Sequence, residues 1–315
     1  MRLIEFKDRF PTEQSCVSEF RRLREKSGII CKRCKGIEHY WLSSKQMYQC
    51  KNSTCRFRTS LKSGTLLENS KLSYMVWFIT MHLMTSSKNN MSALELQRQL
   101  GLKYYEPVFE MMHKIRLVMG KRDDIYDLVG EVELDEGYFS NSKSLERNEF
   151  TGEVAELKRG KGSQKKTPVL VMHSFVKAPL KLEKSKHKIN TIPKFIKMKV
   201  LENVTSKEIT SDAEKSINKN SNIVSDDNKS YKELQNISKT HKSHNASKTE
   251  ISKILPWVHK AITNSKGIII NVHKGISDKY MQNYMNEYCF KFNRRQFKLD
   301  IFDRLILASV LYTWF

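Results

Sequence analysis

The spacing of apolar residues predicts helices between residues 72 and 123. Ser92 has the side chain of a helix N-cap, and Glu95, three residues later, completes a capping-box pattern. Gly101 ends this helix, and a second amphipathic helix from Tyr104 to Val118 has basic residues at and after its end. Helix, glycine turn and basic helix is the order of a helix-turn-helix that reads DNA, although a plain helical hairpin has the same order.

The pattern changes from helical spacing to alternation near residue 131. Val132 and Leu134 alternate with acids within residues 131–139, which predicts a strand with its acids exposed on one face. The apolar run at residues 167–172 predicts the adjacent strand. A third, shorter apolar run at residues 222–227 ends in two consecutive aspartates.

Another helix is predicted from Leu255 to Ile270. Pro256 suits its first turn, where the missing N–H leaves no helical hydrogen bond unmade. His259 and Lys266 lie seven residues apart on this helix, so they share one face. The preceding stretch, residues 240–250, is polar and basic, and is predicted to be a loop over DNA.

The balance of charge adds a class of partner to this pattern. The 315 residues carry 56 Lys and Arg against 34 Asp and Glu, a net charge of +22 that is spread along the chain. A globular protein of this charge usually binds a polyanion, most often nucleic acid, although a basic surface can also serve solubility alone. No apolar run is long enough for a membrane span, and the charged N-terminus lacks the apolar stretch of a signal peptide. We therefore expect an intracellular protein, in the cytoplasm or nucleoid of a prokaryote or in a nucleus.

Four of the six cysteines have the spacing of a structural zinc site. In a reducing compartment, cysteines are metal ligands or free thiols more often than disulfides. Two close pairs separated by 15 residues can give four thiolates to a tetrahedral zinc ion, which then has no open position for chemistry. Chance spacing is the alternative, and Cys16 and Cys289 lie outside the pattern. The predicted zinc ligands are Cys31, Cys34, Cys50 and Cys55.

Acidic residues cluster in the first predicted strand in spite of the positive excess, with four acids among residues 131–136. Clustered carboxylates in a DNA-binding protein favour a divalent cation, which neutralises them and serves phosphoryl chemistry. An exposed acidic edge is the structural alternative. A basic loop with glycines follows the strand, and its cations suit phosphates: Lys158, Arg159, Lys161, Lys165 and Lys166.

Sequence motifs follow the cysteine pairs and the helical segment in a definite order: Val132–Phe139, Lys166–Val169, Leu255–His259, Asn264–Lys266, His273–Ser277 and Phe292–Arg295. This order resembles that of the zinc-ribbon insertion-sequence transposases of the ISXO2-like family, bacterial and archaeal relatives of the eukaryotic Merlin elements. The resemblance extends over nearly the whole chain, from about residue 28 to residue 315.

The resemblance implies an α+β multidomain fold. In this family the catalytic domain is RNase H-like, a mixed α/β sheet flanked by helices, with acids meeting at its centre. We accordingly expect a helical lead-in over residues 1–27, a zinc ribbon over 28–70, a helical, helix-turn-helix-like DNA-binding segment over 71–126, and the catalytic domain over 127–315.

For the catalytic site, the resemblance implies that Asp135 is the first aspartate of the metal-binding triad. Asp226 matches the second, because an apolar strand precedes it and Tyr231 follows five residues later, as in the family pattern. Asp212 is the competing candidate for the second aspartate.

The third position departs from the carboxylate of most enzymes in the superfamily. Counting back from Lys266 puts His259 where a glutamate often stands, and subgroups of the family use histidine or asparagine there. Asn264 is the competing candidate, and a surface histidine on a basic helix is the structural alternative for His259. A neutral ligand leaves the site one negative charge short, so the site should hold Mg²⁺ less tightly and tolerate Mn²⁺.

The implied function is that of a DNA transposase, which binds the terminal inverted repeats of its element, cuts a strand and transfers the 3′-hydroxyl to target DNA. Two Mg²⁺ or Mn²⁺ ions, bound by Asp135, Asp226 and His259, would serve both steps, and Lys266 would hold a phosphate. Further phosphate contacts are expected from the basic loop and from two residues of the closing motif, Arg294 and Arg295.

Transposases usually act as multimers that bridge two DNA ends, so we expect a homodimer or higher multimer on double-stranded DNA, with structural Zn²⁺. Two other classes remain open: a domesticated, catalytically inactive zinc-ribbon DNA-binding protein, and a zinc-ribbon transcription regulator with an unrelated C-terminal domain. Metal-dependent nicking that Asp135→Ala abolishes would separate the transposase from the first. A sheet without acids at its centre would mark the second.

Overall fold

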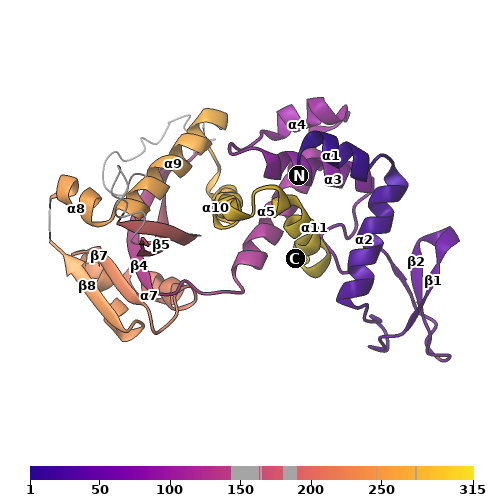
Figure 1. The fold of residues 1–315 in the computed structure, drawn as a ribbon, viewed down its shortest axis with the longest axis horizontal. Helices are drawn as coiled ribbons and strands as arrows, with labels where there is room; N and C mark the ends of the chain where they lie inside the picture. Colours follow the sequence, from indigo (N-terminus) through magenta and orange to yellow (C-terminus); the bar gives the residue numbers. More distant parts are fainter. Residues whose placement is uncertain (143–162, 164, 180–189, 246, 274) are drawn as a thin grey trace, which may run out of the picture. The chain divides into compact units, whose positions relative to one another are not determined.

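The computed structural model describes residues 1–142, 163, 165–179, 190–245, 247–273 and 275–315 (Figure 1). The chain forms two compact units: unit 1 is Met1–Arg122 together with Arg294–Phe315, and unit 2 is Asp123–Asn293. Residues 294–315 thus group with the N-terminal part of the chain, whereas the sequence placed them in the catalytic domain.

Unit 1 contains the helices of the N-terminal part of the chain and the last helix. They are α1 (Leu3–Arg9), α2 (Glu13–Ser27), α3 (Tyr74–Ser86), α4 (Ala93–Leu100), α5 (Tyr105–Asp123) and α11 (Ile301–Leu311), the last preceded by the 3-10 helix η3 (Arg295–Asp300). Helix α11 packs against α2 and α3. The ring centroid of Phe302 lies 5.6 Å from that of Phe6 and 6.2 Å from that of Phe78, so aromatic packing joins both ends of the chain in one core.

The hairpin of α4 and α5 has the predicted turn. The Ser92 hydroxyl accepts a hydrogen bond from the backbone N–H of Glu95 at 3.1 Å, which confirms the N-cap. The Glu95 carboxylate bonds instead to Arg98 and Gln99, so only half of the predicted capping box forms. Gly101 ends α4 at a φ of 64°, where a residue with a Cβ would be strained.

A small three-stranded antiparallel sheet lies between α2 and α3 in the sequence. Its strands are β1 (His39–Leu42), β2 (Met47–Cys50) and β3 (Arg58–Ser60), in that order, with the 3-10 helix η1 (Ser43–Lys45) joining the first two. The rings of Trp41 and Tyr48 pack at 4.7 Å on this sheet. Because so short a sheet buries little apolar surface, its stability depends on the cysteines at its base.

Unit 2 is built on a five-stranded mixed sheet in the order β6-β5-β4-β7-β8 (Figure 1). β5 pairs antiparallel with both β4 and β6, whereas β7 pairs parallel with both β4 and β8. The strand with the alternating acids is therefore the central one. The strands are β4 (Glu131–Ser140), β5 (Lys166–Lys177), β6 (Thr191–Val200), β7 (Asn222–Asp226) and β8 (Thr240–His244).

Helices and apolar side chains cover both faces of this sheet. Phe139 belongs to the core formed with α9 (Pro256–Val272) and α10 (Asp278–Asn293), whereas Val132 and Leu134 belong to the core formed with α7 (Ser206–Glu214) and η2 (Lys229–Asn236). Pro256 occupies the first turn of α9, as predicted. Among the described residues, no helix has both the length and the hydropathy needed to cross a membrane.

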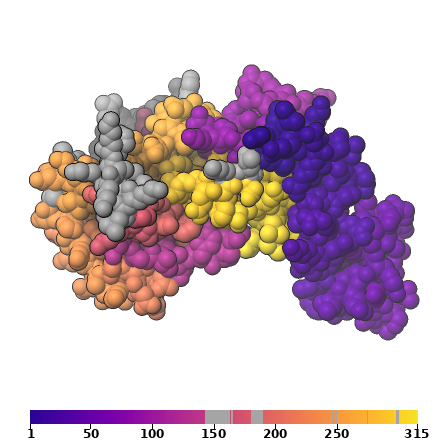
Figure 2. All heavy atoms as spheres, viewed as in Figure 1, coloured from indigo at the N-terminus to yellow at the C-terminus, as the bar shows by residue number. Residues whose placement is uncertain are grey.

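Residues 240–250 do not form the predicted loop. Thr240–His244 form the edge strand β8, and Ser247 caps the short helix α8 (Lys248–Ile254). All five residues of β8 are polar and at least partly exposed, so no apolar alternation marks the strand, and its backbone pairing with β7 holds it in place. In the space-filling view the orange atoms of this region lie on the surface of unit 2 (Figure 2).

Candidate functional site

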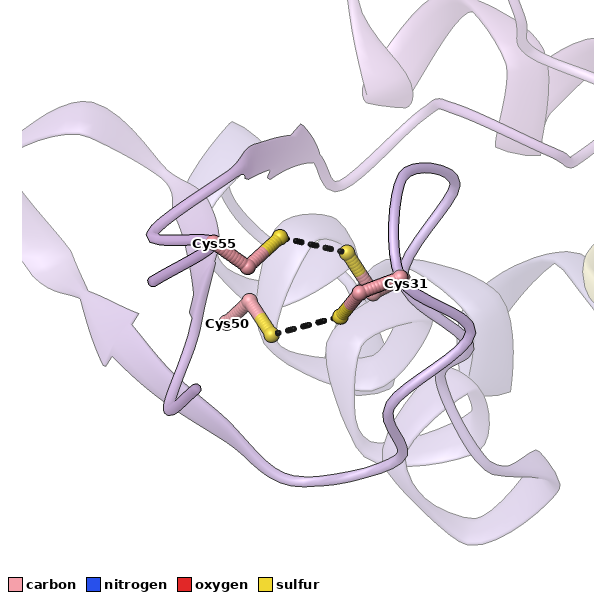
Figure 3. Close-up of side chains that lie close together, drawn as sticks. Cys31, Cys50 and Cys55 are labelled. Carbon is pink, nitrogen blue, oxygen red and sulfur yellow. Dashed lines mark hydrogen bonds between the residues drawn. The ribbon is translucent and has the colours of Figure 1, made fainter. Parts of the chain in front are cut away.

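The four cysteines of the predicted zinc site come together at the base of the small sheet. Their sulfur atoms all lie within 4.8 Å of one another, with 3.7 Å between the Sγ atoms of Cys31 and Cys55 and 3.4 Å between those of Cys34 and Cys50 (Figure 3). Four sulfurs about 2.3 Å from a tetrahedral zinc ion lie about 3.8 Å apart, so the cluster fits this ion. The cysteine spacing thus correctly predicted that these four residues come together.

The backbone around Cys31 favours its thiolate. Donation from the N–H of Cys34, and then from that of Arg33, lowers the pKa of Cys31 to about 6. Gly36 lies against the cluster, because a Cβ at this position would stand 3.3 Å from the Cys34 sulfur. Four thiols with backbone N–H groups aimed at the first of them could hold a structural metal ion.

The second candidate site lies at the centre of the unit 2 sheet, where Asp135 and His259 face each other. Asp135 lies in the middle of β4, and His259 lies in the first turns of α9. The His259 Nε2 atom is 3.6 Å from the Asp135 Oδ2 atom, too far for a hydrogen bond. This buried nitrogen makes no hydrogen bond to any described residue, and a cation could occupy the space between nitrogen and oxygen.

Asp226 reaches the same region from the end of β7. The parallel pairing of Glu133 with Val224 brings Asp226, two residues on, level with Asp135. Its charge acts on both neighbours, because the Asp226 carboxylate contributes to the raised pKa of Asp135 and opposes the lowering of the pKa of His259. Asp212 lies elsewhere, on α7, where the charges around its carboxylate are Lys199, Lys215 and Glu208.

The carboxylate of Asp135 is strongly perturbed. Burial raises its pKa to about 7, the charges of Asp226 and Glu136 add to the rise, and the Glu136 N–H and Lys266 oppose it. Among the described residues, only the four cysteines gather three or more metal-binding side chains within 4.8 Å of one another. The carboxylates and the imidazole therefore converge without closing into a compact ligand set.

The two competitors at the third position differ in where they lie on α9. His259 is one-third exposed and faces Asp135, and burial lowers its pKa. Asn264 is exposed, and five residues at 100° each put it on a different side of the helix from His259. Lys266 returns to the His259 side, two turns on, with its Nζ 5.5 Å from the Phe139 ring. Burial lowers the pKa of Lys266, the nearby Lys166 lowers it further, and Asp135 opposes the change.

The residues expected to contact DNA fall into three groups. Lys158, Arg159 and Lys161 lie outside the described residues. Lys165, Lys166 and Arg295 are exposed. Arg294 is buried, with 4% of its surface exposed, so its guanidinium is not available to a phosphate and the prediction for this residue is not supported. The closing motif suggested a DNA contact, which requires an exposed guanidinium, and Arg294 does not have one.

Two buried residues near the acids were not assigned roles from the sequence. Glu133 lies two residues before Asp135, so the alternation of a strand could have placed it on the same face. In the sequence, Tyr231 served only to support the choice of Asp226, which it follows by five residues. Burial raises the pKa of Tyr231 strongly, and the carboxylates of Glu136 and Asp135 contribute, which places its phenol beside the acid cluster.

Comparison with known proteins bears on this geometry. The family model described as ISXO2-like transposase domain matches residues 127–293, more than half of the 315 residues and the whole region that carries β4, β7 and α9. No curated protein matches the chain. A transposase family implies binding to DNA, in agreement with the basic composition. By this match over its acid-bearing sheet, the chain belongs to the ISXO2-like transposase family.

Proposed function

We propose that this protein is a DNA transposase that cleaves DNA and transfers the 3′-hydroxyl to a target, using Asp135, Asp226 and His259 as metal ligands. The observation that carries the proposal is the convergence of these side chains from β4, β7 and α9, with His259 Nε2 3.6 Å from Asp135 Oδ2. The sheet order, with three antiparallel strands followed by two parallel ones, supports an RNase H-like catalytic domain.

The residues of the site have separate tasks in this mechanism. When bound, two divalent cations supply an activated water or 3′-hydroxyl and neutralise charge at phosphorus. Asp135, which faces His259 and is level with Asp226 on the neighbouring strand, would be a ligand of these cations. Asp226 and His259 complete the set, and the neutral imidazole reduces its negative charge and favours Mn²⁺ over Mg²⁺.

The same site can serve cleavage and joining because both are displacements at phosphorus. In cleavage, a water oxygen forms a bond to phosphorus and the 3′-oxygen of the element leaves. In joining, that 3′-oxygen attacks a target phosphate and another 3′-oxygen leaves, so one phosphodiester replaces another and no ATP is consumed. Lys266, beside Asp135, would hold a phosphate oxygen as a point charge.

The remaining elements are suited to DNA recognition. The cysteine cluster would hold structural Zn²⁺ and with it the small sheet, and the hairpin of α4 and α5 would read the terminal repeats. The exposed cations Lys165, Lys166 and Arg295 would contact the phosphate backbone. Action on two element ends calls for a dimer or higher multimer on DNA.

The test is Mn²⁺-dependent nicking and strand transfer with DNA that carries the flanking repeats. We expect Asp135→Ala, Asp226→Ala and His259→Ala to lower the rate by about 10³-fold or more while DNA binding persists. The matched controls, Asp212→Ala and Asn264→Ala, should retain activity. His259→Glu restores a carboxylate and should shift the metal preference from Mn²⁺ towards Mg²⁺.

Two results would contradict the proposal. Loss of activity with Asp212→Ala and survival with Asp226→Ala would overturn the assignment of the second aspartate. A purified chain that binds the repeats and never cuts them in either metal would instead identify a DNA-binding protein without catalytic activity.

A further inference from the structure

Glu133 connects the central strand to the start of the helix that carries His259. Its side chain is almost fully buried, with 2% of the residue exposed. The carboxylate Oε2 atom accepts hydrogen bonds from the backbone N–H groups of Trp257 at 2.7 Å and Val258 at 2.8 Å. These are the two residues directly before His259.

Among the residues that the structure describes, no other side chain caps these donors at the first turn of α9. Leu255, at the N-cap position, has no side chain that can accept a hydrogen bond, and Pro256 has no N–H. The N–H groups of Trp257 and Val258 would therefore be unpaired without Glu133. The cap of α9 is thus a side chain of β4, 124 residues before Trp257 in the chain.

A second contact fixes α9 on the other side of Asp135. Gly137 lies two residues beyond Asp135 on the same face of β4, and a Cβ at this position would stand 3.2 Å and 3.3 Å from side-chain atoms of Ile262. Helix α9 therefore approaches β4 closely at residues 257–258 and at residue 262. His259 and Asp135 face each other between these two contacts.

We propose that Glu133 is a positioning residue: it holds the first turn of α9 against β4 and so places the His259 imidazole opposite the Asp135 carboxylate. A buried carboxylate is costly, and an apolar side chain would fill the same space at a lower desolvation cost. An apolar side chain, however, cannot accept the hydrogen bonds that the N–H groups of Trp257 and Val258 donate. The importance of this placement for catalysis rests on the proposed function, whereas the placement itself does not.

The test compares Glu133→Ala and Glu133→Gln with a matched control in the full-length protein. Glu131→Gln is the control, because Glu131 lies two residues earlier on the same strand face and bonds to Asn222 instead of α9. Three quantities are measured: the Kd for Mn²⁺ from the electron paramagnetic resonance of the free ion, the hydrogen exchange of the 257–259 amides, and the kcat and KM of nicking. All are compared at one pH, on protein with its zinc retained.

For Glu133→Ala we expect the Mn²⁺ Kd to rise about 10- to 100-fold, as is usual when the partner of a metal ligand is removed. Exchange at Trp257 and Val258 should become faster, and kcat should fall while the KM for DNA stays unchanged. Glu133→Gln keeps one carbonyl acceptor and should recover part of each change. Glu131→Gln should resemble the wild type.

Wild-type values of Mn²⁺ Kd and amide exchange in Glu133→Ala would overturn the proposal. If that variant fails to fold, Glu133→Gln decides, because replacing one acceptor oxygen with an NH₂ group at nearly constant shape should still accelerate exchange and weaken Mn²⁺ binding. A wild-type chain that binds Mn²⁺ but never cuts DNA contradicts the proposed function alone. Activity in the wild type with unaffected Glu133 variants contradicts the positioning role alone.

Discussion

At the scale of single residues, the most unusual group is the carboxylate of Asp135. An exposed aspartate ionises near pH 4, whereas burial and the neighbouring Asp226 raise the pKa of Asp135 to about 7. Without a cation, the folded chain therefore binds this proton more tightly than the unfolded chain does. The resulting stability is present at acid pH and is lost as the pH rises from about 4 through about 7.

This loss can be measured with Asp135→Asn, which mimics the protonated acid. The free energy of unfolding of the variant, relative to that of the wild type, should increase between pH 5 and pH 8 by on the order of 1–4 kcal/mol, because over this range the folded wild type comes to carry a buried charge. Urea titrations at both pH values, without added Mg²⁺ or Mn²⁺, give this difference. Asp227→Asn, at an exposed neighbouring position, should show no such divergence. A constant difference between Asp135→Asn and the wild type would contradict the raised pKa.

At the scale of elements, the contact between β4 and α9 decides the geometry of the site. The alternation along β4 puts Glu133, Asp135 and Gly137 on the face that α9 covers. Each of the three has a different role. Glu133 accepts hydrogen bonds from two backbone N–H groups of α9, and Asp135 faces His259. Gly137 leaves space for the Ile262 side chain.

Gly137→Ala tests the closeness of this approach. The new methyl group would meet Ile262 at 3.2 Å and the Phe139 ring at 3.0 Å, so we expect a loss of about 1–3 kcal/mol in the free energy of unfolding. Adding Ile262→Ala to Gly137→Ala should cost less than the two single changes together, since it removes the clash. Gly267→Ala is the control on α9, where a Cβ meets nothing within 4 Å and should stabilise the helix by about 0.5–1 kcal/mol. Equal effects at the two glycines, measured by urea unfolding, would contradict a tight contact.

The elements differ in how far the sequence predicts them. β4 was predicted because its apolar residues alternate with acids, and α9 because Pro256 suits the first turn of a helix. β8 was missed because an edge strand of polar residues has no such period.

The site was harder to predict than its elements. The convergence of Asp226 on Asp135 depends on a parallel pairing across about 90 residues, which no local pattern encodes. Family resemblance supplied that expectation. The role of Glu133 could be seen only in the structure. Strand alternation predicts on which face of β4 its side chain lies, but it does not predict that the N–H groups of Trp257 and Val258 lie opposite that side chain.

At the scale of the whole molecule, the cysteine cluster and the five-stranded sheet that carries Asp135 belong to different units. The small sheet has few buried apolar side chains besides its cysteines, whereas unit 2 has a core on each face of its sheet. Their stabilities should therefore respond differently to loss of a structural metal.

Zinc removal tests this difference. A strong zinc chelator should unfold β1–β3 and make four thiols reactive, while the amides of β4 and β5 keep their protection from exchange. Cys16 and Cys289 should react slowly, because both are buried in packed helices. Thiol titration together with hydrogen exchange measures both effects. If the four thiols stay unreactive after the metal is removed, or if the unit 2 sheet unfolds as well, then β1–β3 are not an independent module that zinc stabilises.

The grouping of residues 294–315 with unit 1 has a consequence for synthesis on the ribosome. The backbone N–H of Leu66 bonds to the carbonyl of Ser309, and α11 packs against α2 and α3. Unit 1 can therefore be completed only after α11 has been translated, whereas all residues of the unit 2 sheet are synthesised before α11. A premature stop codon after residue 293 would therefore keep Asp135, Asp226 and His259, the proposed metal ligands, and yet leave unit 1 without α11.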